Sequence, residues 1–338
     1  MALSIGVVGY GYWGPNIARN IEDIDGAELG GICDLDTELL SKARSRYPGI
    51  LLGADHREIT ESTDLDAVAV VTPVNTHYEI ARSALEHGKH VFVEKPFTAS
   101  ADQADELIEL ASRNNLTIMV DHTFLFTGAV RKIKDIVASG QLGDVLYFDS
   151  TRVNLGLFQH DINVVWDLAP HDLSIMDHVV GKKALAIAAH GIDHFGGNLE
   201  NIAFITLYCE DDFIAHFNVN WLSPVKIRKT LIGGSEKMLV WDDTQADEKI
   251  KIYDKGVSVD SKESIRRRLV SYREGDAQIP KIDSTEALRM EIEYFIECVG
   301  EGKTPVNDGN AGLRVVRCLE AAQRSIDNQG QLIELGRI

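Results

Sequence analysis

A glycine-rich turn between a short strand and a helix constrains the fold of this chain most. Residues 5–8 are apolar, and they lead directly into the run GYGYWG at residues 9–14 and then into helical apolar spacing. In a G-x-G-x-x-G turn the first glycine permits a tight turn, the second admits a phosphate close to the backbone, and the third lets the helix pack on the strand. The helix N-terminus adds unpaired N–H groups that attract phosphate. The sequence therefore predicts a Rossmann-type dinucleotide site, with contacts from Gly9, Gly11, Tyr12, Trp13 and Gly14.

A carboxylate at the end of the next strand indicates which dinucleotide binds. The predicted strand Ala27–Cys33 ends in Asp34, 20 residues after Gly14. A carboxylate there accepts hydrogen bonds from the adenosine ribose and repels a 2′-phosphate. The alternative is an ordinary solvated residue at a strand end. Because Asp34 follows the glycine-rich turn at this spacing, we expect NAD as the cofactor rather than NADP.

Composition limits the classes of partner. A chain of 338 residues is long enough for about two domains. Its net charge of −18 argues against nucleic acid and anionic membranes, whose phosphates it would repel. The 4 cysteines are scattered and predict reduced thiols in a cytoplasmic protein. The apolar N-terminus lacks the basic segment of a signal peptide and is expected to be the first strand.

Strands and helices alternate up to about residue 120. The further strands expected are Val68–Val71, His90–Val93 and Thr117–Val120, and the helices are His77–Glu86 and Ala101–Arg113. Repeated βα units predict a parallel sheet with helices on both faces and ligands at the carboxyl ends of the strands. Thr72 and the run Glu94-Lys95-Pro96 lie at such ends. We therefore expect a Rossmann domain over residues 1–121.

The pattern changes in the second half, where strands follow one another. They are expected at Val145–Val153, Leu185–Gly191, Ala203–Cys209, Phe213–Asn220, Ile227–Ile232 and Met238–Trp241, after a helix at Val130–Ala138. Asp211-Asp212 is typical of a hairpin turn. These strands predict an open, mainly antiparallel sheet, covered on one face by a helix over Asp172–Val180, in a C-terminal α/β domain over residues 122–338. Residues 254–283 are expected to be irregular, and helices are expected at Thr285–Val299 and Ala311–Ile326.

Two places carry residues suited to acid–base chemistry. Lys95 at a strand end can hydrogen-bond a substrate hydroxyl and stabilise developing negative charge. Asp167 and His171 have the i, i+4 spacing that puts two side chains on one helix face. Pro170 is tolerated in a first turn, so this helix is expected to begin near Asp167. An imidazole suits a general base, and a carboxylate can orient it. The alternatives are a helix cap, a buried structural histidine or a metal pair, and no metal is predicted.

Four motifs in this order resemble the Gfo/Idh/MocA family of sugar oxidoreductases. They are GYGYWG at 9–14, TPVNTH at 72–77, EKP at 94–96 and D-x-x-x-H at 167–171. The resemblance implies a Rossmann domain followed by an α/β domain, with subunits associating through the open sheet as a homo-dimer or homo-tetramer. It implies hydride transfer from a secondary alcohol of a sugar or cyclitol to the nicotinamide of NAD. By motif, the catalytic trio is Lys95, Asp167 and His171.

The run WDLAPHD at 166–172 resembles a subgroup that acts in nucleotide-sugar metabolism. It favours a nucleotide-linked amino sugar oxidised at C3. The alternatives are an inositol-type cyclitol dehydrogenase and a dinucleotide-binding regulator without turnover, against which the complete trio argues. Further cofactor contacts are expected from Thr72, Asn75, His77, Glu94 and Lys95. Substrate contacts are expected from Lys95, His122, Arg152, Asn154, His160, Asp161, Asn163 and His171.

Overall fold

The computed structural model describes residues 2–156, 161–258 and 271–336. The chain divides into two compact units, one of Met1–Phe126 with Thr285–Arg317 and one of Thr127–Ser284 with Cys318–Ile338. This division differs from a single boundary after residue 121. The reason is that helix α9 (Ala287–Glu301) returns to pack against α1 (Gly14–Asp23) and the short helix η1 (Thr123–Phe126). The division of cofactor and substrate binding between domains stays a prediction.

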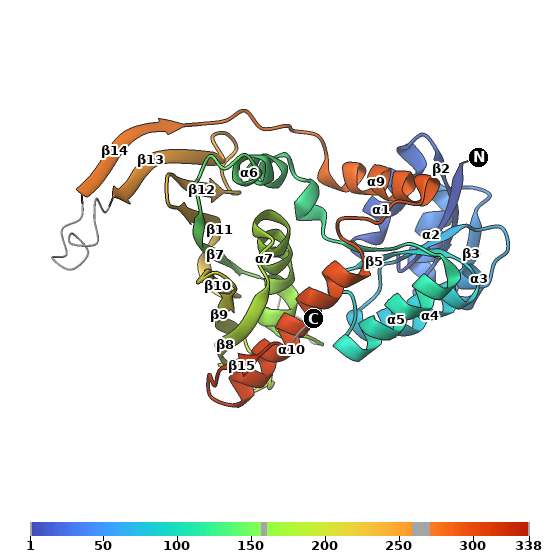
Figure 1. The fold of residues 1–338 in the computed structure, drawn as a ribbon. Coiled ribbons are helices and arrows are strands. Elements are labelled where there is room, and N and C mark those ends of the chain that lie inside the picture. Colours follow the sequence, from blue (N-terminus) through green and yellow to red (C-terminus); the bar gives the residue numbers. More distant parts are fainter. Residues whose placement is uncertain (1, 157–160, 259–270, 337–338) are drawn as a thin grey trace. The chain divides into compact units, whose positions relative to one another are not determined.

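The first unit contains a six-stranded parallel sheet in the order β3-β2-β1-β4-β5-β6, as a Rossmann fold requires (Figure 1). Its strands are β1 (Leu3–Val8), β2 (Ala27–Cys33), β3 (Leu51–Gly53), β4 (Ala67–Val70), β5 (His90–Glu94) and β6 (Ile118–Asp121). The remaining helices are α2 (Thr37–Arg46), α3 (Arg57–Thr60), α4 (Val74–Glu86) and α5 (Ala101–Asn114). The predicted parallel sheet is confirmed, and α2, β3 and α3 are additions to it.

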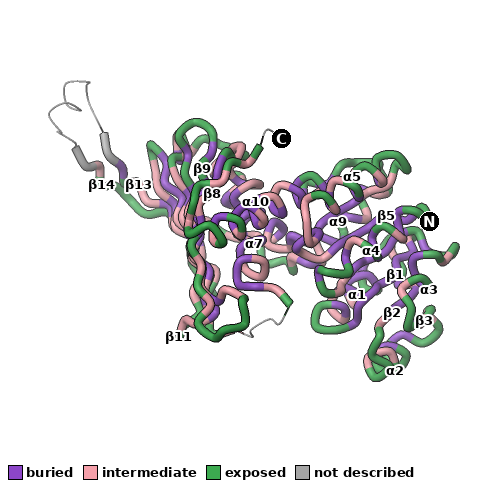
Figure 2. The backbone as a smooth tube through the Cα atoms, turned by 90° about the horizontal axis from the view of Figure 1, so that it is seen from below, coloured by how far each residue is buried: buried purple, intermediate pink, exposed green. Residues whose placement is uncertain are grey.

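The centre of this sheet is buried because helices cover both of its faces. Strands β1 and β4 are buried along almost their whole length, which explains their continuous apolar runs (Figure 2). In α1 the buried apolar residues are Ile17, Ala18 and Ile21, the helical spacing seen in the sequence. This packing holds the glycine-rich turn between β1 and α1.

The second unit contains a nine-stranded sheet in the order β14-β13-β12-β11-β7-β10-β9-β8-β15. Its strands are β7 (Val145–Leu155), β8 (Ala184–Ile192), β9 (Ile202–Cys209), β10 (Ile214–Asn220), β11 (Leu222–Gly234), β12 (Met238–Asp242), β13 (Ile250–Ser258), β14 (Ser271–Gln278) and β15 (Ile333–Glu334). Strands β7 and β10 pair in parallel and the other neighbours are antiparallel, which confirms the mainly antiparallel sheet.

The turn between β9 and β10 is the hairpin that the sequence predicts. Asp211 and Asp212 have φ of 56° and 55° between β9 and β10, the left-handed pair typical of a two-residue hairpin turn.

Residues 254–283 are not wholly irregular, because β13 and β14 extend the sheet edge there. Their charged residues hid a strand pattern, since both strands lie at or next to the edge, where polar side chains are tolerated.

Helix α7 (Val164–Val180) covers one face of this sheet and contacts β7, β9 and β10 (Figure 1). It begins at Val164, so the expected start near Asp167 is wrong. The side chain of Asn163 caps the helix by accepting from Val165 N and Trp166 N, which outweighs Pro170 inside the helix. The described residues also form helix α6 (Gly128–Ala138) in this unit and helix α10 (Gly309–Asp327), which spans the boundary between the units. Among the described residues, no helix has the length and hydropathy needed to cross a bilayer.

Candidate active site

The glycine-rich turn has the open backbone surface that a pyrophosphate needs. Gly9 has φ of +100°, and a Cβ there would lie 2.3 Å from Val71 O. A Cβ on Gly14 would lie 2.2 Å from Gly9 O, whereas one on Gly11 would meet no heavy atom within 4 Å in the described structure. Gly9 and Gly14 are thus required by the fold, and Gly11 leaves space. Within the described chain, α1 begins without a side-chain cap, and the exposed rings of Tyr12 and Trp13 lie beside this end.

Asp34 joins the second strand to this turn. Its Oδ2 accepts a hydrogen bond from Tyr10 N at 2.6 Å, and its Oδ1 accepts from Asp36 N at 2.8 Å. The carboxylate is therefore held at the carboxyl end of β2 against the loop that would cradle the pyrophosphate. This placement suits recognition of the adenosine ribose and also stabilises the loop.

The ends of β4 and β5 are joined through His77. Its imidazole is buried, with Nε2 2.7 Å from Thr72 O and Nδ1 2.9 Å from Pro96 O. Burial lowers the pKa of His77, so the ring is neutral and donates to only one of these two carbonyls at a time. This geometry favours a positioning role over the expected direct cofactor contact. Asn75 is exposed on the first turn of α4, and Thr72 accepts from Thr76 Oγ1.

Lys95 follows the last residue of β5, and His122 follows the last residue of β6. Glu94 Oε2 accepts from Lys95 N at 2.8 Å, which fixes the backbone at this strand end. His122 is buried, and neither ring nitrogen has a hydrogen-bond partner in the described part of the chain. Burial and the positive charge of Lys95 lower the pKa of His122 to about 3, so the imidazole is neutral at physiological pH.

Two buried carboxyl groups, those of Asp121 and Glu291, form a pair at the end of β6. Asp121 ends β6 and accepts from the Thr123 hydroxyl, and Glu291 Oε1 accepts from Asn307 Nδ2 at 3.0 Å. Burial, followed by the negative charge of Asp121, raises the pKa of Glu291 well above its ordinary value. We did not predict this pair from the sequence. The available signal was an acidic residue on the apolar face of α9 formed by Leu288, Ile292 and Phe295.

In the second unit, Asp167 and His171 lie half-buried in the first turns of α7. The indole Nε1 of Trp221 donates to Asp167 Oδ2 at 3.0 Å. Sequence reasoning missed Trp221, because it lies 54 residues away, between β10 and β11.

Two expected substrate contacts have structural partners instead. Arg152 forms a two-point buried ion pair with Asp172, through Nε at 2.9 Å and Nη2 at 2.8 Å. Asn163 caps α7 and donates through Nδ2 to Glu200 and Gln323. These interactions explain both residues as supports of α7, so the structure speaks against their expected substrate contacts.

The remaining expected substrate contacts are Asn154, His160 and Asp161. Asn154 is half-buried in β7, and Asp161 is exposed before α7. His160 lies outside the described residues.

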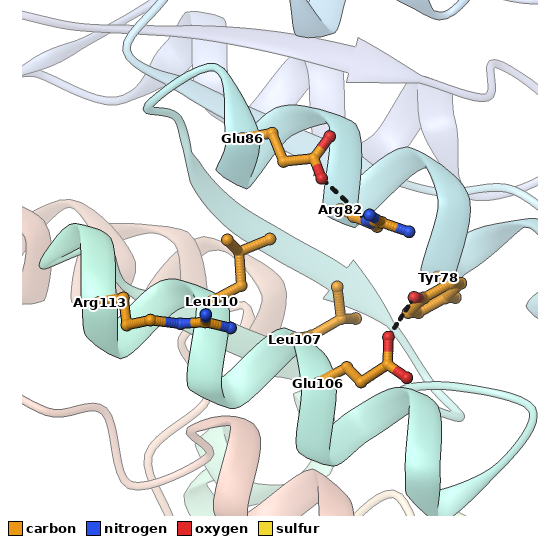
Figure 3. A pocket seen from close by; sticks show the side chains of 7 residues that line it. All are labelled: Tyr78, Arg82, Glu86, Glu106, Leu107, Leu110 and Arg113. Atoms are coloured by element: carbon orange, nitrogen blue, oxygen red, sulfur yellow. Dashed lines mark hydrogen bonds and ion pairs between the residues drawn. The ribbon is translucent and has the colours of Figure 1, made fainter.

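A separate surface cavity of about 360 Å³ lies between α4 and α5 (Figure 3). It is lined by Tyr78, Arg82, Glu86, Glu106, Leu107, Leu110 and Arg113. Its charged groups are paired, since Tyr78 donates to Glu106 and Arg82 to Glu86. None of the residues expected to bind the cofactor or to act in catalysis lines this cavity, so it is not a candidate for the active site.

Family models match both halves of the chain. The model described as "Oxidoreductase family, NAD-binding Rossmann fold" matches residues 3–122, and the Gfo/Idh/MocA C-terminal domain matches residues 130–240. The chain belongs to the Gfo/Idh/MocA oxidoreductase family. The resemblance drawn from the motifs is therefore confirmed, together with the NAD-binding Rossmann fold.

Oxidoreductases with different named activities are similar to the chain. An uncharacterized oxidoreductase of Streptococcus pneumoniae is 36% identical over 147 residues, a match that spans 44% of this chain and only 39% of that protein. A UDP-N-acetylglucosamine 3-dehydrogenase of Acidithiobacillus ferrooxidans is 25% identical over 92% of this chain and 93% of its own length. Its solved structure superposes with a TM-score of 0.80 at 22% identity, over 97% of this chain and 99% of that one. A scyllo-inositol 2-dehydrogenase of Bacillus subtilis is 25% identical over 89% of this chain and 87% of its own length.

Proposed function

We propose that this Gfo/Idh/MocA protein is an NAD-dependent oxidoreductase acting on C3 of a nucleotide-linked amino sugar. The reaction moves a hydride between the secondary alcohol and the nicotinamide, in either direction. The observation that carries the proposal is the Asp167–His171 pair on α7, retained together with Lys95 at the end of β5. A dinucleotide-binding regulator has no need of these three groups.

The residues of the first unit suit NAD. The open face of Gly11 and the uncapped start of α1 would hold the pyrophosphate, and Asp34 would accept from the adenosine ribose. Bound NAD+ supplies the acceptor for the hydride. His77 would keep the ends of β4 and β5 together beneath it.

The catalytic roles follow from residue type and placement. His171 would take the hydroxyl proton as the carbonyl forms, because a neutral imidazole accepts a proton near pH 7. Asp167 would stabilise the resulting imidazolium, and Lys95 would hydrogen-bond the reacting oxygen and stabilise its negative charge. His122, buried without a partner in the described structure, is suited to gain one from the substrate.

The substrate class rests on the run WDLAPHD and on the full-length similarity to a UDP-N-acetylglucosamine 3-dehydrogenase. The second candidate is an inositol-type dehydrogenase, favoured by a similarity of the same size to a scyllo-inositol 2-dehydrogenase.

Self-association through the second unit is part of the proposal. The face of the sheet opposite α7 exposes Phe204, Tyr208 and Ile214, while their neighbours Ala203, Ile205 and Ala215 are buried. Apolar side chains gathered on a sheet face are typical of a protein interface. We propose that two or four copies pair through this face.

The test of the substrate class is NAD+ reduction, followed by absorbance, with UDP-N-acetylglucosamine, free N-acetylglucosamine and scyllo-inositol. We expect the highest kcat/KM with the nucleotide sugar. A higher value with the inositol would select the second candidate, and no reduction of NAD+ or oxidation of NADH with any alcohol or ketone tested would select the regulator.

A further inference from the structure

We infer that Trp221 is a positioning residue for the reaction, acting through the carboxylate of Asp167. Its indole Nε1–H donates to Asp167 Oδ2 at 3.0 Å. This role rests on the proposed function of Asp167, and no motif of the sequence points to it.

The backbone around Trp221 is held firmly enough for the indole to act as a fixed donor. Trp221 N donates to Asn201 O at 2.9 Å, and Trp221 O accepts from Gly156 N at 3.3 Å. The ring is 1% exposed, so its position is set by packing. A buried indole N–H usually pairs with an acceptor, and for Trp221 that acceptor is Asp167.

The contact restrains the two torsions of the Asp167 side chain. A hydrogen bond from an N–H to a carboxylate is short, directional and stronger than one between neutral groups. With Oδ2 held by the indole, the plane of the carboxylate is set and the direction of Oδ1 follows. A carboxylate aimed in this way can orient an imidazole or a substrate hydroxyl without losing rotamer entropy in each turnover.

Trp221 also connects Asp167 to the segment expected to meet the substrate. A Cβ on Gly156 would lie 3.4 Å from Trp221 Cδ1 and 3.0 Å from Asn154 Nδ2. The distance to Trp221 Cδ1 is an ordinary van der Waals contact, so Gly156 lies next to the indole. Trp221 thus lies beside both the proposed catalytic carboxylate and Gly156, the residue that follows β7.

A second buried tryptophan of the same unit provides a matched control. Trp241 is 2% exposed, and its Nε1 has no hydrogen-bond partner within the described residues. Trp241→Phe removes a similar ring volume and no hydrogen bond, whereas Trp221→Phe removes the same volume and the donor to Asp167. The difference between the two variants reports the contact rather than the loss of packing.

The kinetic test uses NAD+ and UDP-N-acetylglucosamine, or whichever alcohol the wild-type protein oxidises. Trp221→Phe is expected to lower kcat about 10- to 100-fold, the size of one hydrogen bond to a charged group, with the Kd of NAD unchanged. In an Asp167→Ala background the same change is expected to have little further effect, because its target is gone. Wild-type kcat in Trp221→Phe, or an equal loss in Trp241→Phe, would overturn the inference.

A second measurement does not depend on turnover. In the ¹⁵N-labelled protein, the indole N–H resonance of Trp221, assigned as the one missing in Trp221→Phe, is expected to move upfield in Asp167→Ala while that of Trp241 stays. An unmoved Trp221 resonance would overturn the contact itself. An inactive wild-type protein in which the resonance moves would instead contradict the proposed function and leave the contact standing.

Discussion

Asp34 and Tyr10 are joined by a hydrogen bond of 2.6 Å, from the backbone N–H of Tyr10 to the carboxylate Oδ2. The residue expected to select the cofactor thus also holds the glycine-rich turn in place. Its second oxygen accepts from Asp36 N, so both oxygens take part in the loop geometry.

Asp34→Ser should narrow the preference for NAD over NADP. In the wild-type protein we expect NAD to bind at least about tenfold more tightly, or about 1.4 kcal/mol, by titration calorimetry. The variant should lose affinity for NAD and lose less for NADP, since the repulsion of the 2′-phosphate disappears. Asp36→Ser removes a neighbouring carboxylate but leaves an oxygen that can cap α2, so it should keep the wild-type preference. Equal dissociation constants of the wild-type protein for NAD and NADP would contradict the role of Asp34 in selecting the cofactor.

Lys95→Ala should leave the binding of NAD nearly intact and lower kcat by about 10²- to 10⁴-fold, as expected for loss of a charge-stabilising group. The assay is initial-rate NAD+ reduction, with the exposed Lys42→Ala as the control. A variant that keeps its kcat and shows only a raised KM would mean that Lys95 binds substrate without acting on the reacting oxygen.

Arg152→Met should destabilise the fold by about 3–5 kcal/mol, because it leaves the buried carboxylate of Asp172 without its cation. Urea unfolding measures this loss, and adding Asp172→Leu should recover part of it. An unchanged free energy of unfolding together with a raised KM would instead support the substrate contact that the sequence suggested for Arg152.

Glu291→Gln should change how stability depends on pH. The pKa of Glu291 is raised in the fold, so the folded protein keeps this proton when the unfolded chain has lost it. Its contribution to stability is therefore full below about pH 4.3, the value for an unfolded Glu, and is lost as pH rises through the higher folded pKa.

The amide keeps an oxygen for Asn307 and cannot ionise, so the variant should lose less stability between about pH 5 and pH 8 than the wild type. Urea unfolding at several pH values measures the slope. Glu293→Gln, an exposed change on the same helix, should keep the wild-type slope, and a wild-type slope in Glu291→Gln would contradict the assignment.

The parts of the fold that local pattern determines were predictable. The run GYGYWG and Asp34 lie within one βα unit, where strand, turn and helix are set by neighbouring residues. The hairpin at Asp211-Asp212 is equally local. The six-stranded parallel sheet and the mainly antiparallel sheet followed from repeated short patterns and are confirmed.

Arg152 and Asn163 have hydrogen-bond partners that lie far from them in the sequence, so their contacts could not be predicted from local patterns. Arg152 and Asn163 were expected to contact the substrate, because nothing local indicates Asp172, Glu200 or Gln323 as partners. The predicted start of α7 was wrong for a local reason, because the cap at Asn163 starts the helix earlier than the position of Pro170 indicated. The roles of Lys95, Asp167 and His171 stay predictions.

The most direct measurement is the fate of deuterium at C3 of UDP-N-acetylglucosamine during NAD+ reduction, followed by mass spectrometry of the NADH formed. We expect one deuterium in each NADH and none when the label is at C4, because the hydride comes from C3. Unlabelled NADH from the C3-labelled sugar, or no reduction with this sugar while scyllo-inositol reduces NAD+, would contradict the proposed reaction.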